Sequence, residues 1–442
     1  MITYKILGKN IYQDETTGEL FSSNFYITSV NKNVLKKLFL NNYSPTCYRF
    51  CVLFGSKCNL NCSYCFSTHD DDDFNINYIL SKLDFLFSLF PEGEKYFIDM
   101  SGECEPLLYL DKILIIANYC KNKSNSLRKE IIPCFVTNGT LLSDNIVKIL
   151  RENNILFGIS FDGILRVNDK KRINLFGESF GKDIIRRISK LEDRSLIGVS
   201  VTLTDDVFNI VESIKFLNKY FDSICFRTCR QNFCTTPEIT LKWIKEYEKL
   251  GAWILGELKN GSIKSLKPLI NSDDYFSKFI GSFILNTKYL NRCDASISRF
   301  TILKNDFLCG CPPQKYNPNS HFFANDAKLN QFKEIKNCVE LCNDCLFKIY
   351  CGGFCKVEKT TCEIAVLNNI CLFRKNLILI AFAVSEEIKS KREIYKEVFM
   401  LYDQRKTDTL FSDPKLIRYC NDNKHISFFD ARIQFYERKH KI

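Results

Sequence analysis

The sequence predicts an α/β fold, because short apolar runs alternate with amphipathic helical stretches from residue 48 to residue 258. Apolar runs of this kind are typical of strands in a parallel sheet whose faces are covered by helices. The predicted strands span residues 48–54, 96–100, 131–137, 155–160, 197–203 and 223–228. The predicted helices span residues 78–90, 110–121, 144–152, 182–191, 207–221 and 238–258.

Residues 1–46 lie before this alternation and predict a β-rich N-terminal extension. Strands are predicted at residues 3–7 and 21–28, around a polar turn that contains Thr17 and Gly18, and a short helix follows at residues 33–40. We interpret this segment as an extension at the edge of the main sheet.

Composition and charge indicate the cellular location, the role of the cysteines and the partners to expect. The 442 residues include 22 cysteines, and the chain begins without the basic segment and apolar core of a signal peptide. No stretch approaches the roughly eighteen uninterrupted apolar residues of a membrane span. We therefore expect a cytoplasmic protein whose clustered cysteines bind metal. The net charge of +11 is spread among interleaved acidic residues, so we expect neither a nucleic-acid nor a membrane partner.

Three cysteines in the loop after the first strand of the alternation form the strongest motif. Cys58, Cys62 and Cys65 have C-x3-C-x2-C spacing. Thiolates are soft ligands, and three on one loop can hold three corners of a cubane iron–sulfur cluster. The fourth corner would then be open to a small molecule. The alternatives are half of a zinc site or a run of buried structural cysteines.

This motif, with Tyr64 directly before the third cysteine, resembles the signature of the radical S-adenosylmethionine (SAM) superfamily. The resemblance implies a partial (β/α)6 TIM-like barrel over residues 47–265. It also implies a [4Fe–4S] cluster on the three cysteines, with SAM chelated to the unique iron and reductively cleaved to a 5′-deoxyadenosyl radical. Residues 1–46 are short for the winged-helix peptide-recognition domain of some relatives, so a reduced form of it is the alternative to an edge extension.

Other loops at the same end of the strands resemble segments of this superfamily. Ser101-Gly102-Glu103-Cys104-Glu105-Pro106 resembles a Gly-Gly-Glu-Pro segment with one residue inserted, and its backbone would bind the amino group of SAM. Either glutamate could fill the acidic position. Asn138 belongs to another recurring segment. Ser160 would bind the ribose or carboxylate of SAM, and Arg172 its carboxylate, although Arg172 could instead be a surface arginine on a loop.

Two further groups of residues have simpler interpretations. His69 and the aspartates at residues 70–73 follow the cysteine loop, and four consecutive acidic residues are more often a solvated loop than a metal site. Cys225, Cys229 and Cys234 are loosely spaced around the sixth strand, and we interpret them as packed or free thiols.

A second group of cysteines occupies residues 285–375. Cys342, Cys345, Cys351 and Cys355 have a 2-5-3 spacing that resembles the SPASM extension of radical SAM enzymes, which holds one or two auxiliary [4Fe–4S] clusters. By this resemblance, the outer cluster would be bound by Cys342, Cys345, Cys351 and Cys371. The inner cluster would be bound by Cys355, Cys293 and one or both of Cys309 and Cys311. The role of Cys362 stays open, and structural zinc is the alternative.

The sequence departs from the relatives that mature sulfatases at two positions. Arg299 stands where they carry a further cysteine, and Gly310 or Pro312 stands where they carry an aspartate proposed as the base. An inner cluster with three protein ligands could then bind a cysteine thiolate of a peptide substrate, as proposed for relatives that form thioethers.

The resemblance implies a radical SAM/SPASM peptide maturase, which abstracts hydrogen from a ribosomal peptide or protein and installs a crosslink, thioether or oxidation. A ferredoxin or flavodoxin would supply electrons. The alternatives are an enzyme like the anaerobic sulfatase maturases and a zinc-dependent binding or scaffold protein. Residues 376–442 predict a helical and mixed tail, with an amphipathic helix from Asn376 to about Met400 and no motif.

Overall fold

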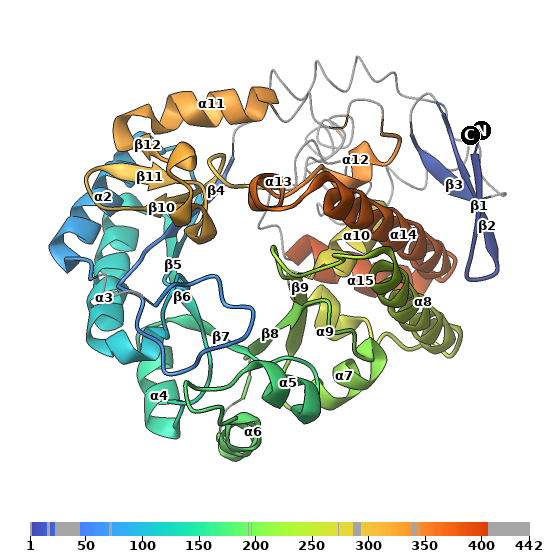
Figure 1. Ribbon diagram of the computed structural model, residues 1–442, viewed down its shortest axis with the longest axis horizontal. Helices are drawn as coiled ribbons and strands as arrows, with labels where there is room; N and C mark the ends of the chain where they lie inside the picture. The colour runs from blue at the N-terminus through green and yellow to red at the C-terminus, as the bar shows by residue number, and fades with distance from the viewer. Residues whose placement is uncertain are drawn as a thin grey trace, which may run out of the picture.

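The computed structural model describes residues 2–15, 18–22, 45–69, 73–192, 194–195, 197–272, 274–285, 293–337, 342 and 345–404. The predicted helix at 33–40, Thr17, most of the predicted strand at 21–28 and the chain beyond residue 404 lie outside the described residues. A curved sheet surrounded by helices forms the main body of the molecule (Figure 1).

Nine strands form the main sheet, in the order β12-β11-β10-β4-β5-β6-β7-β8-β9. The six consecutive strands from β4 to β9 are parallel and correspond to the six strands that the sequence predicts. They are β4 (Cys47–Cys51), β5 (Lys95–Asp99), β6 (Glu130–Thr137), β7 (Leu156–Ser160), β8 (Gly198–Leu203) and β9 (Ser223–Thr228). Neighbouring strands pair in register, so that Tyr48 pairs with Tyr96 and Tyr96 with Ile131.

Three further strands from the cysteine-rich region extend this sheet beyond β4. Strand β10 (Arg299–Ile302) pairs with β4 in parallel, and β11 (Phe307–Cys309) and β12 (Phe322–Phe323) follow as antiparallel strands. These three strands were not predicted, because the segments are short and have no clear alternation. The pairing joins the cysteine-rich region to the barrel through backbone hydrogen bonds.

Six helices that the sequence predicts follow the parallel strands: α2 (Ile76–Leu89), α3 (Leu110–Leu127), α4 (Asp144–Glu152), α6 (Gly181–Lys190), α7 (Ile210–Leu217) and α8 (Pro237–Lys259). Side chains of Asn75, Ser143, Asn209 and Thr236 accept backbone N–H bonds at the starts of α2, α4, α7 and α8. Helices α5 (Leu165–Lys171), α9 (Lys267–Ile270) and α10 (Tyr275–Ile284) were not predicted. Single-turn 3₁₀ segments occur at Pro106–Tyr109, Pro312–Tyr316, Pro318–Ser320 and Ala324–Asp326.

Strand alternation separates the core from the interior of the barrel. Tyr48 and Phe50 of β4 are fully buried and pack with Phe87 and Phe90 from the region of α2. Arg49, between them in the sequence, instead lines the central cavity and pairs with Asp99 at 2.9 Å. The apolar core therefore lies between sheet and helices, and the barrel interior is lined by polar side chains such as Arg49 and by apolar ones such as Phe97.

The N-terminal strands β1 (Ile2–Ile6), β2 (Lys9–Gln13) and β3 (Leu20–Ser22) form a separate antiparallel sheet. The interpretation of this segment as an edge extension of the main sheet is therefore wrong for its described residues. A tight turn at Leu7 and Gly8, both with positive φ, lets β1 pair with β2, a strand that the sequence analysis missed. The local hairpin satisfies backbone bonds that an edge strand would have made with the barrel.

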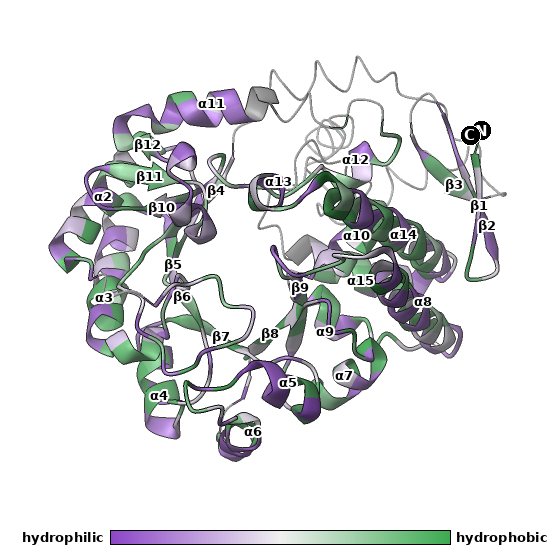
Figure 2. Cartoon of the chain, in the orientation of Figure 1, coloured by the Kyte–Doolittle hydropathy of each residue, from purple (hydrophilic) through white to green (hydrophobic). Residues whose placement is uncertain are grey.

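The C-terminal part is helical, with α11 (Ala327–Asn337), α12 (Lys348–Cys351), α13 (Lys356–Thr361), α14 (Ile364–Lys389) and α15 (Arg392–Gln404). The single helix predicted from Asn376 to about Met400 is thus two helices, and the first begins earlier. Among the described residues, α14 is the one helix long and apolar enough to cross a membrane by length and composition. Its central residues, 377–384, are all buried and pack between α8 and α10, as expected of a core helix (Figure 2).

Candidate functional site

A cavity of about 1670 Å³ lies inside the barrel and is lined by residues of the parallel strands and of the loops that follow them. All eleven residues that the sequence analysis assigned to the first cluster and to SAM line this cavity: Cys58, Cys62, Tyr64, Cys65, Ser101, Gly102, Glu103, Glu105, Asn138, Ser160 and Arg172. They come from the loops after four different strands. Only the tertiary fold brings them to one site, because they span more than a hundred positions in the sequence.

The loop that carries Cys58, Cys62 and Cys65 is held by backbone hydrogen bonds to the segment after β7. Asn61 N–H donates to the carbonyl of Ile173 at 2.6 Å, and Ser63 N–H donates to that of Lys171 at 3.0 Å. Burial raises the pKa of Cys58 and Cys65, and it raises the pKa of Cys62 to about 11. Bound metal would supply the positive charge that three thiolates need here, so the donor set fits an iron–sulfur cluster.

Arg172 and Tyr64 lie beside the second cysteine. The Arg172 guanidinium has Nη1 3.7 Å from Cys62 Sγ and Nε 3.9 Å from Asp162, and Tyr64 donates a 2.5 Å hydrogen bond to the same aspartate. Arg172 is buried, so its interpretation as a surface arginine on a loop is wrong. It follows α5, whose seven residues were not predicted and which turns the chain back under the cysteine loop.

The two glutamates of the inserted segment make different contacts. Glu105 accepts hydrogen bonds from Thr137 Oγ1 at 2.5 Å, Asn138 N at 2.7 Å and Leu107 N at 3.1 Å. Glu103 accepts a 2.7 Å hydrogen bond from Lys315 in the cysteine-rich region. Glu105 thus joins the loops after β5 and β6, whereas Glu103 joins the barrel to the C-terminal part.

Close packing and hydrogen bonds hold Gly102, Ser101 and Asn138 in the loops that surround the three cysteines. A Cβ on Gly102 would lie 2.4 Å from Leu53 Cδ2, so a larger residue there would displace the Leu53 side chain. Ser101 Oγ accepts a 2.8 Å hydrogen bond from Val136 N. Asn138 donates to Asn59 Oδ1 at 2.7 Å and has Nδ2 3.9 Å from Cys58 Sγ. Asn138 therefore directs an N–H group toward a candidate cluster ligand.

His69 also lines the cavity, with Nδ1 3.0 Å from the carbonyl oxygen of Ser56. Of the acidic run that follows it, the aspartates at residues 70–72 lie outside the described residues. Asp73 is exposed and forms an ion pair with Lys112.

The four cysteines assigned to the outer auxiliary cluster line one small second cavity: Cys342, Cys345, Cys351 and Cys371. Cys342 and Cys345 precede α12, Cys351 is the last residue of α12, and Cys371 comes from α14. Gly352 and Gly353 have φ values of 67° and 83°, which lets the chain turn sharply after Cys351.

Cysteines of the inner group separate into two environments. Cys311, Cys293 and Cys355 gather in a small cluster with Ala295 and Val357. Cys309 instead belongs to the main hydrophobic core and donates from Sγ to the Cys311 carbonyl at 3.3 Å. The structure therefore brings Cys311, not Cys309, to the other two, because residues two apart around the end of β11 turn away from each other once the strand ends.

Cys362 and Arg230 complete this region. Cys362, at the end of α13, donates from Sγ to the carbonyl oxygen of Arg230 at 3.2 Å. The Arg230 Nε lies 3.4 Å from Cys355 Sγ. A hydrogen bond from Cys293 lowers the pKa of Cys355, and the Arg230 guanidinium lowers it further. A lone arginine after a strand carries no motif, so Arg230 was not among the predicted site residues.

Among the described residues, no three His, Cys, Asp or Glu side chains lie close enough together to hold a single metal ion.

Comparison with protein families supports the same reading of the barrel. Residues 52–204, which include the cysteine loop and the loops after β5, β6 and β7, match the Radical SAM superfamily. The chain carries a radical SAM domain. The cofactors of such a domain are a [4Fe–4S] cluster and SAM, as predicted, and the predicted relationship to SPASM-type radical SAM maturases is confirmed.

Curated relatives resemble parts of the chain. An uncharacterized protein of Methanocaldococcus jannaschii is 30% identical over 166 residues, which cover 37% of this chain and 55% of the relative. A cysteine-type anaerobic sulfatase-maturating enzyme of Clostridium novyi is 29% identical over 190 residues, 41% of this chain and 50% of the relative. The chain thus spans about half the length of these relatives.

Solved structures share the fold. The structure of anSMEcpe with bound AdoMet and Cp18Cys peptide aligns with a TM-score of 0.60 at 18% identity, covering 78% of this chain and 99% of the other. Native anSMEcpe with bound AdoMet aligns with a TM-score of 0.59 at 18% identity, covering 78% and 100%. The predicted fold, a radical SAM barrel followed by a cysteine-rich region of SPASM type, is confirmed.

Proposed function

We propose that this protein is a radical SAM enzyme that modifies a peptide or protein substrate by hydrogen abstraction. The observation that carries the proposal is the convergence of the three-cysteine loop and eight other residues of four loops on one 1670 Å³ cavity. A cavity of this size inside a barrel exceeds what SAM alone would need and leaves room for a substrate side chain with its flanking backbone.

Cys58, Cys62 and Cys65 would hold the [4Fe–4S] cluster. The cluster and SAM, when bound, supply a 5′-deoxyadenosyl radical that takes a hydrogen atom from the substrate. The chain's own residues would bind and orient the cluster and SAM. Asn138 and Arg172 direct N–H groups toward the sulfurs of Cys58 and Cys62, at 3.9 Å and 3.7 Å.

The SAM molecule itself would be bound by the surrounding loops. The backbone at Ser101-Gly102-Glu103 would bind its amino group, with Glu105 keeping the loop in place through three hydrogen bonds. Ser160 would bind its ribose or carboxylate, and Arg172 its carboxylate. Tyr64, bonded to Asp162, would form the wall of the cavity beside Cys62.

We further propose that residues 47–265 are the radical SAM core, residues 285–375 an auxiliary-cluster domain and residues 1–46 an N-terminal extension. The expected tail at 376–442 does not begin as a separate part, because α14 continues across residue 375 and packs between α8 and α10. Cys342, Cys345, Cys351 and Cys371 would hold an outer cluster. Cys293, Cys311 and Cys355 would hold an inner one. An auxiliary cluster next to the cavity would accept the electron that a substrate radical releases on oxidation.

Peptide or protein substrates are supported by the relative from Clostridium novyi, which is a sulfatase-maturating enzyme, and by the fold that the chain shares with anSMEcpe, whose structure contains a peptide. A sulfatase as substrate is the second candidate. It is less well supported, because Cys311 is followed by Pro312 rather than by an aspartate. The cytoplasmic location and the ferredoxin or flavodoxin donor stay predictions from the sequence.

The test is anaerobic reconstitution of the full chain with iron and sulfide, followed by addition of dithionite and SAM. The proposal expects about twelve irons per chain if three clusters form, and it expects 5′-deoxyadenosine as a product. Colourless protein that binds zinc and releases no 5′-deoxyadenosine would instead support the alternative of a zinc-dependent binding or scaffold protein.

A further inference from the structure

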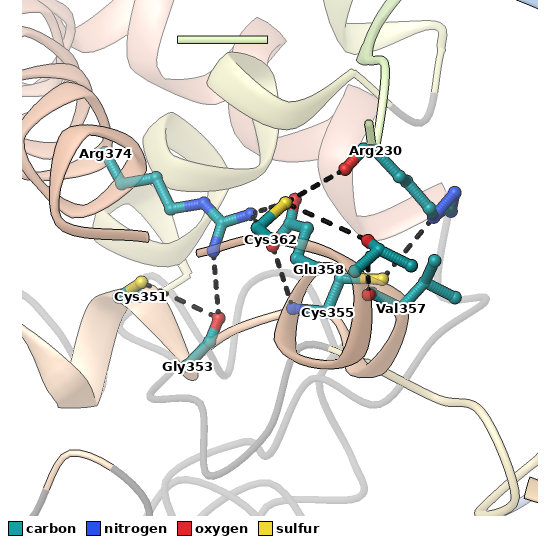
Figure 3. A network of polar contacts seen from close by, with 9 residues as sticks. Arg230, Cys351, Gly353, Cys355, Val357, Glu358, Cys362 and Arg374 are labelled. Atoms are coloured by element: carbon teal, nitrogen blue, oxygen red, sulfur yellow. Dashed lines mark hydrogen bonds and ion pairs between the residues drawn. The ribbon is translucent and has the colours of Figure 1, made fainter. Parts of the chain in front are cut away.

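Arg230 belongs to the barrel but contacts the cysteine-rich region. It follows β9 by two residues, and its side chain lines the central cavity. Its Nε lies 3.4 Å from Cys355 Sγ at the start of α13, and its carbonyl oxygen accepts a hydrogen bond from Cys362 at the end of the same helix (Figure 3). One residue of the barrel therefore holds both ends of α13.

The Arg230 guanidinium lies among sulfur atoms: it contacts Cys355 and interacts with Cys311 and Cys293, and Glu358 is a further interacting group. Both oxygens of Glu358 bind Arg374 at 2.8 Å. The guanidinium is thus the positive group in contact with Cys355, and it shares the surroundings of Cys311 with Arg299.

We propose that Arg230 is a positioning residue that raises the reduction potential of an iron–sulfur cluster held by Cys293, Cys311 and Cys355. The inference rests on the proposed function, in which these cysteines hold a cluster. One-electron reduction adds one negative charge, which spreads over the ligand sulfurs and takes up no proton. A guanidinium that donates an N–H···S bond to one of these sulfurs stabilises the reduced form.

The position of Arg230 indicates how a raised reduction potential would serve electron transfer from the substrate. Its side chain lies between the cavity and Cys355, so the positive charge is on the side from which a substrate radical would release its electron. Raising the potential there favours transfer of that one electron to the inner site. Because Arg230 is on the loop after β9, substrate binding in the barrel and redox tuning of the inner site would depend on the same backbone segment.

The test is a redox titration of the full chain, monitored by electron paramagnetic resonance, in a Cys58→Ala/Cys345→Ala background where the inner signal is observed alone. Arg230→Gln is expected to shift the inner midpoint potential to a more negative value, and Arg230→Lys to shift it less, because lysine keeps the charge but not the planar N–H donor. Arg166→Gln removes an exposed arginine on α5 and is the matched control, with no shift expected.

An unchanged potential in Arg230→Gln overturns the proposal, as does the absence of any inner-site signal in the parent background. If Arg230→Gln fails to retain iron, Arg230→Lys decides: a negative shift supports the proposal and the parent value overturns it. A protein that shows the shift but modifies no peptide would refute the proposed substrate class while leaving the role of Arg230 intact.

Discussion

The carboxylate of Glu358 accepts two hydrogen bonds from Arg374 Nη2, each 2.8 Å long, and the two side chains are 3% and 6% exposed. Arg374 also donates from Nη1 to the carbonyl of Gly353 at 3.4 Å, and Glu358 accepts from Cys355 N at 3.1 Å. This buried pair joins the turn after Cys351, in the outer cysteine group, to Cys355 in the inner group. It therefore sets the relative position of the two proposed auxiliary sites.

Replacing Arg374 with methionine is expected to lower the free energy of unfolding by roughly 3–5 kcal/mol, because it leaves the Glu358 carboxylate buried without its partner. Denaturant unfolding of the protein measures the loss. The double variant Arg374→Met/Glu358→Leu is the control and should recover much of the stability. Equal destabilisation by the single and double variants would show that the arginine acts by packing and not as an ion-pair partner.

Replacing Cys58 with alanine should abolish cleavage of SAM, because two thiolates on the loop cannot hold the cluster. Iron analysis should show a loss of about four irons per chain, and chromatography should detect no 5′-deoxyadenosine above background. Cys104→Ala is a suitable control, since that thiol lines the same cavity but is outside the three-cysteine motif. Continued cleavage in Cys58→Ala would refute the assignment of the loop.

Cys309 and Cys311 should respond differently to replacement with alanine. Cys311→Ala removes a ligand of the proposed inner cluster and should reduce bound iron by about four per chain. Cys309→Ala should keep the iron and lower the free energy of unfolding by roughly 1 kcal/mol, because it empties a small volume of the core. Iron content and thermal unfolding of the two variants distinguish them. Loss of iron from Cys309→Ala alone would reverse the assignment.

Replacing Cys345 with alanine should separate SAM cleavage from product formation. The outer cysteine group lies apart from the cavity that holds the first cluster loop, so 5′-deoxyadenosine should still form while the modified peptide is lost. Mass spectrometry of peptide and 5′-deoxyadenosine in one reaction measures both. If Cys345→Ala and Cys58→Ala release equal amounts of 5′-deoxyadenosine, the two cysteine groups have been given the wrong roles.

Local patterns in the sequence were sufficient to predict the parallel strands of the barrel and the helices that follow them. The six parallel strands and six helices follow from apolar periodicity and capping residues, which act within a few positions, and the strand at residues 223–228 has the predicted bounds. The three-cysteine loop was recognisable for the same reason, because its ligands are near neighbours in the chain. Element type and motif identity were therefore determined by the sequence alone.

Contacts between distant segments were decided only by the tertiary structure. Arg172 could not be distinguished from a surface arginine until α5 turned it under Cys62, and Cys309 could not be separated from Cys311 until β11 was paired in the sheet. Arg230 acquires its role from Cys355, which lies 125 positions away. Periodicity reports how a segment is buried but not what it is buried against, because that depends on packing between elements with no local sequence signal.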